Sequence, residues 1–222
     1  SLTSDPRRDA ASVAPLEQAF AGLVERLGGA HIGHHYLDET LLAKYGRVEG
    51  GALIVGRCRY DSLIIPDMPC IDGATAALLR EYVRNGGRLY LDGQRPSLVD
   101  GRPAETGWLV SNLSWEELAQ EEIRVDDPAT AVRSTLRRSE NGDFLFAVNL
   151  SEDTACTLRY RLRAEGAALF FPLTGECRPL AYEKDGDGID LTLHFKPGQS
   201  HIVLLGPTEP APSPRWPPPV RA

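Results

Sequence analysis

The chain has 222 residues, which is enough for one large domain or two smaller ones with separate cores. Hydrophobic residues make up 42% and charged residues 25%, as in an ordinary globular protein. The net charge of −7 argues against a nucleic-acid partner, because no basic surplus exists to displace counterions. No apolar run approaches the ~20 residues of a membrane helix, and the N-terminus lacks the apolar region of a signal peptide. We therefore expect neither a nucleic-acid nor a membrane partner, and we favour the cytoplasm as the location.

The cysteines form no metal-binding or redox motif. Cys58, Cys70, Cys156 and Cys177 are scattered without a C-x-x-C pair. We expect them to be buried free thiols, and we expect no metal and no cofactor.

Residues 1–110 alternate between helix and strand. Helices are expected at 15–29, at 38–46 with Asp38 as N-cap, and at 75–85 with Thr75 as N-cap and Gly86–Gly87 as its end. Strands are expected at 30–37, 51–55, 62–66 and 88–91. Apolar strands that alternate with helices predict a flavodoxin-like α/β domain with a parallel sheet covered on both faces. Because this half begins with a helix, we expect its first strand to lie upstream, in a longer protein.

The rest of the chain has the rhythm of an antiparallel β-sandwich. A linker at 111–130 contains a short helix, with Ser114 and Glu117 at capping-box spacing. About seven strands follow in 131–206, beginning with a hairpin at Asn141–Gly142. In "CTLRYRLRA", apolar residues alternate with arginines, which predicts a half-buried strand with a basic outer face. Residues 207–222 form a proline-rich tail.

Three groups of side chains are candidates for chemistry. The histidines of "HIGHH" (His31, His34 and His35) would not converge on a metal if the segment is a strand, because His34 points to the opposite face. Five aspartates lie near predicted strand ends, where open α/β sheets bind ligands, although caps and turns use aspartate more often. They are Asp61, Asp67, Asp72, Asp92 and Asp100.

Aromatic residues of the predicted sandwich are a third group. Phe170 and Phe171 are adjacent, so one ring must face outward if the segment is a strand. An outward ring could stack on a sugar, but we expect the α/β half to cover it. The ligand-binding candidates are therefore Phe170, Phe171 and Asp92, and no residue is assigned as catalytic.

The stretch "YDSLIIPDM", followed by a helix and "GGRLYLDGQR", resembles the class I glutamine amidotransferase-like fold. That fold carries a cysteine nucleophile on an elbow of the form G-x-C-x-G-x-Q. Gly93 matches the second glycine, which places Leu91 at the nucleophile position. Leucine cannot form a thiolate, so we expect no acyl-transfer chemistry from this half.

The whole chain resembles the non-catalytic C-terminal region of α-L-rhamnosidase-type glycoside hydrolases, where an amidotransferase-like domain precedes a β-sandwich. The resemblance rests on "YDSLIIPDM", "LLREYVRNGGRLYLDGQRPSLVDGRP", "DFLFAVNLS" and "LTLHFKPGQSHIVLL". It implies an accessory or assembly module of a glycosidase, with the catalytic domain of the same parent chain as partner. A carbohydrate-binding module is the alternative, and a carbohydrate ligand and a homo-oligomer remain open.

Overall fold

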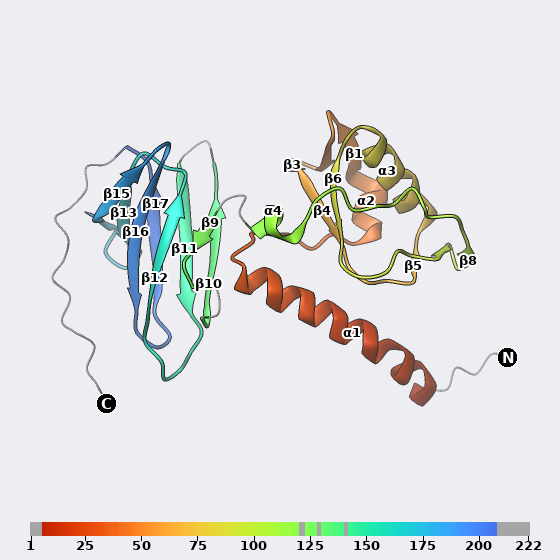
Figure 1. Ribbon diagram of the computed structural model, residues 1–222, viewed down its shortest axis with the longest axis horizontal. Coiled ribbons are helices and arrows are strands. Elements are labelled where there is room, and N and C mark those ends of the chain that lie inside the picture. Colours follow the sequence, from red (N-terminus) through yellow and green to blue (C-terminus); the bar gives the residue numbers. More distant parts are fainter. Residues whose placement is uncertain (1–5, 120–122, 128–129, 140–141, 208–222) are drawn as a thin grey trace. The chain divides into compact units, whose positions relative to one another are not determined.

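The computed structural model (Figure 1) describes residues 6–119, 123–127, 130–139 and 142–207. The chain divides into two compact units. Unit 1 comprises Ser1–Arg26 and His34–Leu118, and unit 2 comprises Leu27–Gly33 and Ala119–Ala222. Among the described residues, no helix is both long enough and apolar enough to cross a membrane.

The helices of unit 1 follow the predicted order with shifted starts. α1 (Pro6–Gly29) ends at the predicted glycines but begins earlier, so that Pro15 lies inside it. α2 (Glu39–Tyr45) begins as predicted, because Asp38 Oδ1 accepts a hydrogen bond from the Leu41 N–H at 2.8 Å. α3 (Gly73–Arg84) has Asp72 at its N-cap position, so the prediction of Thr75 as N-cap is wrong.

α3 ends in the predicted glycine pair. Gly86 has a φ of 80°, which glycine adopts without strain, and the Gly87 N–H donates to the Tyr82 carbonyl at 2.9 Å. A Cβ on Gly87 would lie 2.4 Å from the Tyr82 ring, so only glycine fits here. Tyr82 is fully buried and its hydroxyl donates to the Arg88 carbonyl at 2.9 Å. The two glycines therefore end α3 and leave space for the buried ring of Tyr82.

The strands of unit 1 do not form the predicted continuous parallel sheet. β1 (Gly46–Glu49), β2 (Ala52–Val55) and β3 (Cys58–Tyr60) pair antiparallel, since tight turns with positive-φ glycines join them. Parallel pairing among the described residues is limited to β4 (Ser62–Ile65) with β6 (Arg88–Leu91) and β5 (Cys70–Ile71) with β7 (Leu98–Val99). β8 (Arg102–Pro103) pairs with β7 antiparallel. The unit is a mixed α/β fold with small parallel sheets.

The predicted strand at residues 30–37 is absent, so that prediction is wrong. His31 has a φ of 58°, a left-handed conformation that is incompatible with an extended strand. α4 (Trp115–Ala119), in contrast, confirms the capping box: the Ser114 N–H donates to Glu117 Oε2 at 2.7 Å and the Glu117 N–H to Ser114 Oγ at 3.2 Å.

Unit 2 contains two antiparallel sheets that share one apolar core. The first has the order β10 (Val132–Arg137), β11 (Asp143–Asn149), β17 (Ser200–Leu205), β13 (Ala167–Phe171) and β14 (Glu176–Pro179). The second has the order β15 (Tyr182–Asp185), β16 (Gly188–Phe195), β12 (Cys156–Leu162) and β9 (Ile123–Val125). Leu145, Val203, Leu158 and Tyr160 are among the fully buried residues between them.

The sandwich confirms most of the predicted strands. The expected hairpin joins β10 and β11, although Asn141 lies outside the described residues. In β12 the apolar residues Leu158, Tyr160 and Leu162 face the core, as the alternation predicts. The segment "CRPLAYE", expected as one strand, is divided between β14 and β15, which belong to different sheets. Leu180 and Ala181 connect the two strands.

Candidate functional site

Asp92, a predicted ligand residue, is already paired in unit 1. Its Oδ1 forms an ion pair with the Arg26 guanidinium, and its side chain is only 14% exposed. The Asp92 N–H donates to the Ile65 carbonyl at 2.8 Å, which extends the β4–β6 pairing by one bond. The structure therefore places Asp92 in a tertiary contact between α1 and the end of β6.

The other aspartates that follow strands also serve turns and caps. Asp61 pairs with Arg59 at 2.9 Å, and Asp100 Oδ1 accepts from the Gly73 N–H at 2.8 Å. Asp67 Oδ1 accepts from the Gln94 N–H at 3.3 Å, while Asp72 occupies the N-cap position of α3 without a side-chain hydrogen bond to the helix. Within the described ranges, no three His, Cys, Asp or Glu side chains gather in a way that could hold a metal ion.

The three predicted histidines have separate environments. His34 Nε2 lies 3.1 Å from the Tyr36 hydroxyl, and His35 Nδ1 lies 2.9 Å from the Tyr60 hydroxyl. His31 is 3% exposed in unit 2, and neither of its ring nitrogens has a hydrogen-bond partner among the described residues. Burial, reinforced by the charge of Arg133, lowers the pKa of His31 to about 4, so this ring is neutral at pH 7.

The elbow resemblance ends at Gly93. Leu91 is the last residue of β6, and Gly93 follows with a φ of 108°. The chain then continues to β7 without entering a helix, so the strand–turn–helix geometry of a nucleophile elbow is missing. The expected free thiols are present, but the prediction that all are buried is wrong, because Cys58 and Cys177 are exposed.

Phe170 and Phe171 point to opposite faces of β13. Phe171 shares the inner face with Leu169, and the Arg178 guanidinium lies 4.7 Å from its ring centroid. Phe170 lies on the outer face, where it is half-buried. The sequence identified this pair as ligand-binding candidates, but it did not reveal which residues surround the outward ring of Phe170.

Phe170 belongs to an apolar strip on the outer face of the five-stranded sheet. In one row, Phe146 is opposite Ile202, which is opposite Phe170. In the next row, Phe144 is opposite Leu204, which is opposite Ala168. Phe146 and Leu204 are each 36% exposed. These six residues of β11, β17 and β13 are called the apolar strip below. The signal for it is present in "DFLFAVN" and "HIVLL", whose strands are apolar on both faces.

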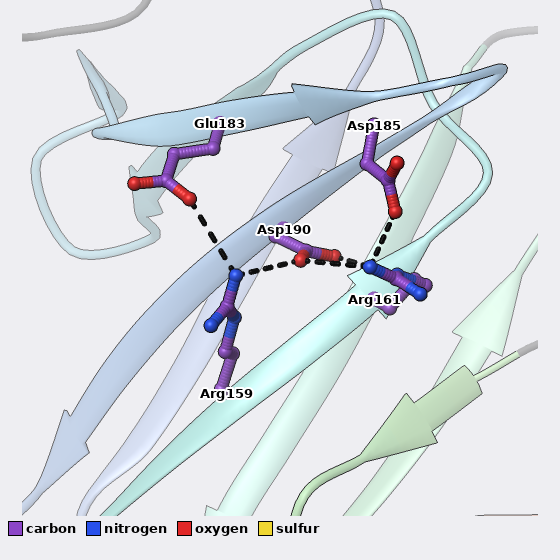
Figure 2. Close-up of polar contacts among 5 residues, drawn as sticks. All are labelled: Arg159, Arg161, Glu183, Asp185 and Asp190. Atoms are coloured by element: carbon purple, nitrogen blue, oxygen red, sulfur yellow. Dashed lines mark hydrogen bonds and ion pairs between the residues drawn. The ribbon is translucent and has the colours of Figure 1, made fainter.

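The outer face of the four-stranded sheet is charged instead, as Figure 2 shows. Asp190 on β16 lies between two arginines of β12, with Arg159 Nη2 2.8 Å from Oδ2 and Arg161 Nε 2.9 Å from Oδ1. Glu183 and Asp185 on β15 add ion pairs to Arg159 and Arg161 respectively. The hydrogen bonds from Arg161 hold the pKa of Asp190 below its usual value. These five charged side chains are thus paired with one another within the sheet.

One hydroxyl–imidazole pair lies farther along the same sheet. Thr157 Oγ1 is 2.6 Å from His194 Nδ1, and the two residues are cross-strand partners. Burial lowers the pKa of His194, which favours the neutral ring. A hydroxyl nucleophile needs an oxyanion stabiliser as well as a base. A cross-strand hydrogen bond is the simpler role for this pair.

Comparisons with known proteins bear on the fold. No protein-family model and no curated protein matches the chain. A solved rhamnosidase from Novosphingobium sp. PP1Y matches 77% of this chain with a TM-score of 0.60 and 18% identity, over 19% of its own length. A GH42 exo-carrageenase from Bacteroides ovatus matches 85% with a TM-score of 0.53 and 12% identity, over 26% of its own length. The chain therefore has the fold of a partial region of two glycoside hydrolases.

Proposed function

We propose that this chain is a non-catalytic accessory and assembly module of a glycoside hydrolase. The observation that supports the proposal most directly is the apolar strip on the outer face of the five-stranded sheet. Contiguous apolar surface that includes exposed side chains, here Phe146 and Leu204, marks an interaction site on a folded protein. The opposite sheet of the same sandwich presents charges that are already paired, so the two outer faces differ in what they can bind.

The partner proposed for the apolar strip is the catalytic domain of the same parent chain. The regions that resemble this chain make up only 19% and 26% of the two matched glycoside hydrolases, so most of each of those enzymes lies outside the match. A protein surface suits the strip better than a sugar does, because its two rows contain only Phe, Ile, Leu and Ala side chains. None of the six side chains of the strip can hydrogen-bond a sugar hydroxyl, and the polar residues of the same rows, Thr135 and Arg137, lie at its β10 edge.

The first test is the coding sequence that surrounds this chain, which should also encode a barrel-sized hydrolase domain. In the parent enzyme, the double variant Phe146→Ser/Leu204→Ser should lower the melting temperature and the glycosidase activity. The same variant should change the melting temperature of the isolated 222-residue chain little, since both side chains are partly exposed there. Arg163→Ser is a control, because Arg163 directly follows β12 and is 74% exposed.

Two results would overturn this proposal. The first is a gene that encodes no hydrolase domain beside the chain, and the second is a parent enzyme indifferent to the double variant. A carbohydrate-binding module is the alternative function, supported by the outward ring of Phe170. A micromolar sugar isotherm of the isolated chain that Phe170→Ala abolishes would establish that alternative instead.

A further inference from the structure

Unit 1 contains an open cavity of about 740 Å³ at the carboxyl end of β6, and most of the residues that line it are exposed. Its walls come from two segments, residues 91–97 and residues 104–111. In open α/β sheets, ligands bind beyond the carboxyl ends of parallel strands, and β4 and β6 are such a pair. The volume lies within the range of small-molecule sites. The position and size of the cavity therefore fit a ligand site.

Hydrogen bonds between the two segments hold the cavity in shape. The Ala104 N–H donates to the Ser97 carbonyl at 3.0 Å, and Arg95 Nη1 donates to the Gly107 carbonyl at 3.3 Å. The Thr106 hydroxyl donates to the Pro96 carbonyl, and Thr106 is buried. These bonds tie the walls to each other before any ligand arrives. Binding would therefore lose little free energy to ordering of the loops.

The lining favours a polar, uncharged ligand. Gln94, Ser97 and Ser111 offer neutral donors and acceptors, and Arg95 and Glu105 contribute charges of opposite sign. One arginine offset by one glutamate gives little attraction to a phosphate, and the segment that directly follows β6 forms no helix whose N-terminus could bind one. Among the described residues, no aromatic side chain lines the cavity, which makes it a poor site for a flat apolar ligand.

We propose that this cavity binds a short neutral oligosaccharide, with Gln94, Arg95 and Glu105 hydrogen-bonding its hydroxyl groups. A carboxylate accepts hydrogen bonds and a guanidinium donates them, so the two groups together suit hydroxyls, which both donate and accept hydrogen bonds. The partly exposed Val110 supplies an apolar contact for the face of a sugar ring. This site lies in unit 1, whereas the residues of the apolar strip belong to unit 2. The proposal for the site therefore does not depend on the proposed assembly role.

Titration of the 222-residue chain with neutral trisaccharides, followed by amide chemical shifts, tests the site. The panel contains linear glucose, galactose and rhamnose trisaccharides, together with a sulfated galactose disaccharide as an anionic arm. We expect at least one neutral trisaccharide to shift amides of residues 93–97 and 104–111 with a Kd of about 0.1–1 mM. Glu105→Ala and Gln94→Ala should each weaken it about fivefold or more, because each removes a hydrogen-bond partner.

Two exposed residues on helices of unit 1 provide matched controls: Glu81→Ala for Glu105→Ala, and Gln18→Ala for Gln94→Ala. Neither control should change the affinity. Ala104→Trp, which places a large ring in the cavity, should abolish binding while the spectrum of unit 2 stays unchanged. The proposal is overturned if no neutral trisaccharide shifts these amides. It is equally overturned if only the sulfated probe binds, or if binding survives both Glu105→Ala and Ala104→Trp.

Discussion

Arg161 and Asp190 face each other across neighbouring strands and share two hydrogen bonds. Arg161 Nε lies 2.9 Å from Oδ1 and Arg161 Nη2 lies 3.2 Å from Oδ2. The two residues are direct partners in the β12–β16 register. A shift by one residue would turn the Asp190 carboxylate toward the apolar core. The pair therefore specifies the register of the four-stranded sheet as well as neutralising its outer face.

Asp190→Ala should destabilise the isolated chain by about 1.5–3 kcal/mol, the range for hydrogen bonds to charged groups. The carboxylate is 7% exposed and accepts bonds from both Arg159 and Arg161, so its loss leaves two arginines without their shared partner. Urea denaturation followed by circular dichroism measures the change. Asp187→Ala is the control, because its ion pair with Arg163 spans 3.9 Å between exposed side chains and should be worth under about 0.5 kcal/mol. Equal costs for the two variants would contradict this role of Asp190.

The same carboxylate should affect acid stability in a defined pH range. Its pKa in the folded chain lies below the ordinary value of 3.8. The stabilisation by Asp190 is therefore complete above pH 3.8 and is lost as the pH falls through the folded pKa. The difference in unfolding free energy between the parent chain and Asp190→Ala should be constant above pH 5 or so and shrink below pH 4 or so.

His31 should affect stability at a higher pH. Its pKa falls from 6.5 to about 4 on folding, so between these values the unfolded chain binds a proton that the folded chain does not. The free energy of unfolding should therefore decrease as the pH falls from 6.5 to 4, by about 3 kcal/mol in total. Asn tolerates a left-handed backbone, so His31→Asn should remove this part of the pH dependence.

Urea denaturation of both proteins at several pH values between 4 and 7 checks the expectation for His31. His194, whose pKa is also lowered by burial, contributes a slope of the same sign in both proteins. The informative quantity is therefore the difference between the two curves. If that difference does not change with pH, the buried ring of His31 is not the group that titrates.

Sequence patterns predicted the sandwich better than the α/β unit, for a physical reason. Leu158, Tyr160 and Leu162 alternate with arginines, and a period of two allows only one assignment of faces. The strands of unit 1 are two to four residues long, too short for a period to show which partner each one takes. Their antiparallel pairing depends on positive-φ glycines at turns, which a pattern of apolar residues does not reveal.

The candidate sites were predictable only in part. Phe170 could be recognised as outward from its neighbour Phe171, but its row with Ile202 and Phe146 depends on strands far apart in the sequence. Asp92 was located correctly at a strand end, yet its pairing with Arg26 on α1 depends on tertiary packing. The pattern of "HIGHH" predicts a strand that includes His31. It does not reveal that His31, which is not a glycine, adopts a left-handed backbone conformation.

The isolated chain should hydrolyse no glycoside, amide or ester at a rate above the uncatalysed background. Thr157 with His194 is a hydroxyl–imidazole pair, but the two residues are cross-strand partners on a strand face. Assays with aryl rhamnosides, aryl galactosides and aryl esters check this. Thr157→Val is the decisive variant: hydrolysis by the parent chain that this variant abolishes would show that the pair is catalytic.

Gly93→Ala should be the most costly glycine substitution at the cavity. Gly93 has a φ of 108°, and an added Cβ would lie 2.8 Å from Asp67 Cβ, so the variant suffers both backbone strain and a steric clash. We expect a loss of about 2–3 kcal/mol in the free energy of unfolding. Gly56→Ala, at a φ of 60° with no atom within 4 Å of the added Cβ, should cost only about 1 kcal/mol because it carries the backbone term alone. Thermal unfolding of the two variants separates the contributions. Equal shifts in melting temperature would mean that the Asp67 side chain moves aside at little energetic cost. The contact between Gly93 and Asp67 would then not stabilise the turn after β6.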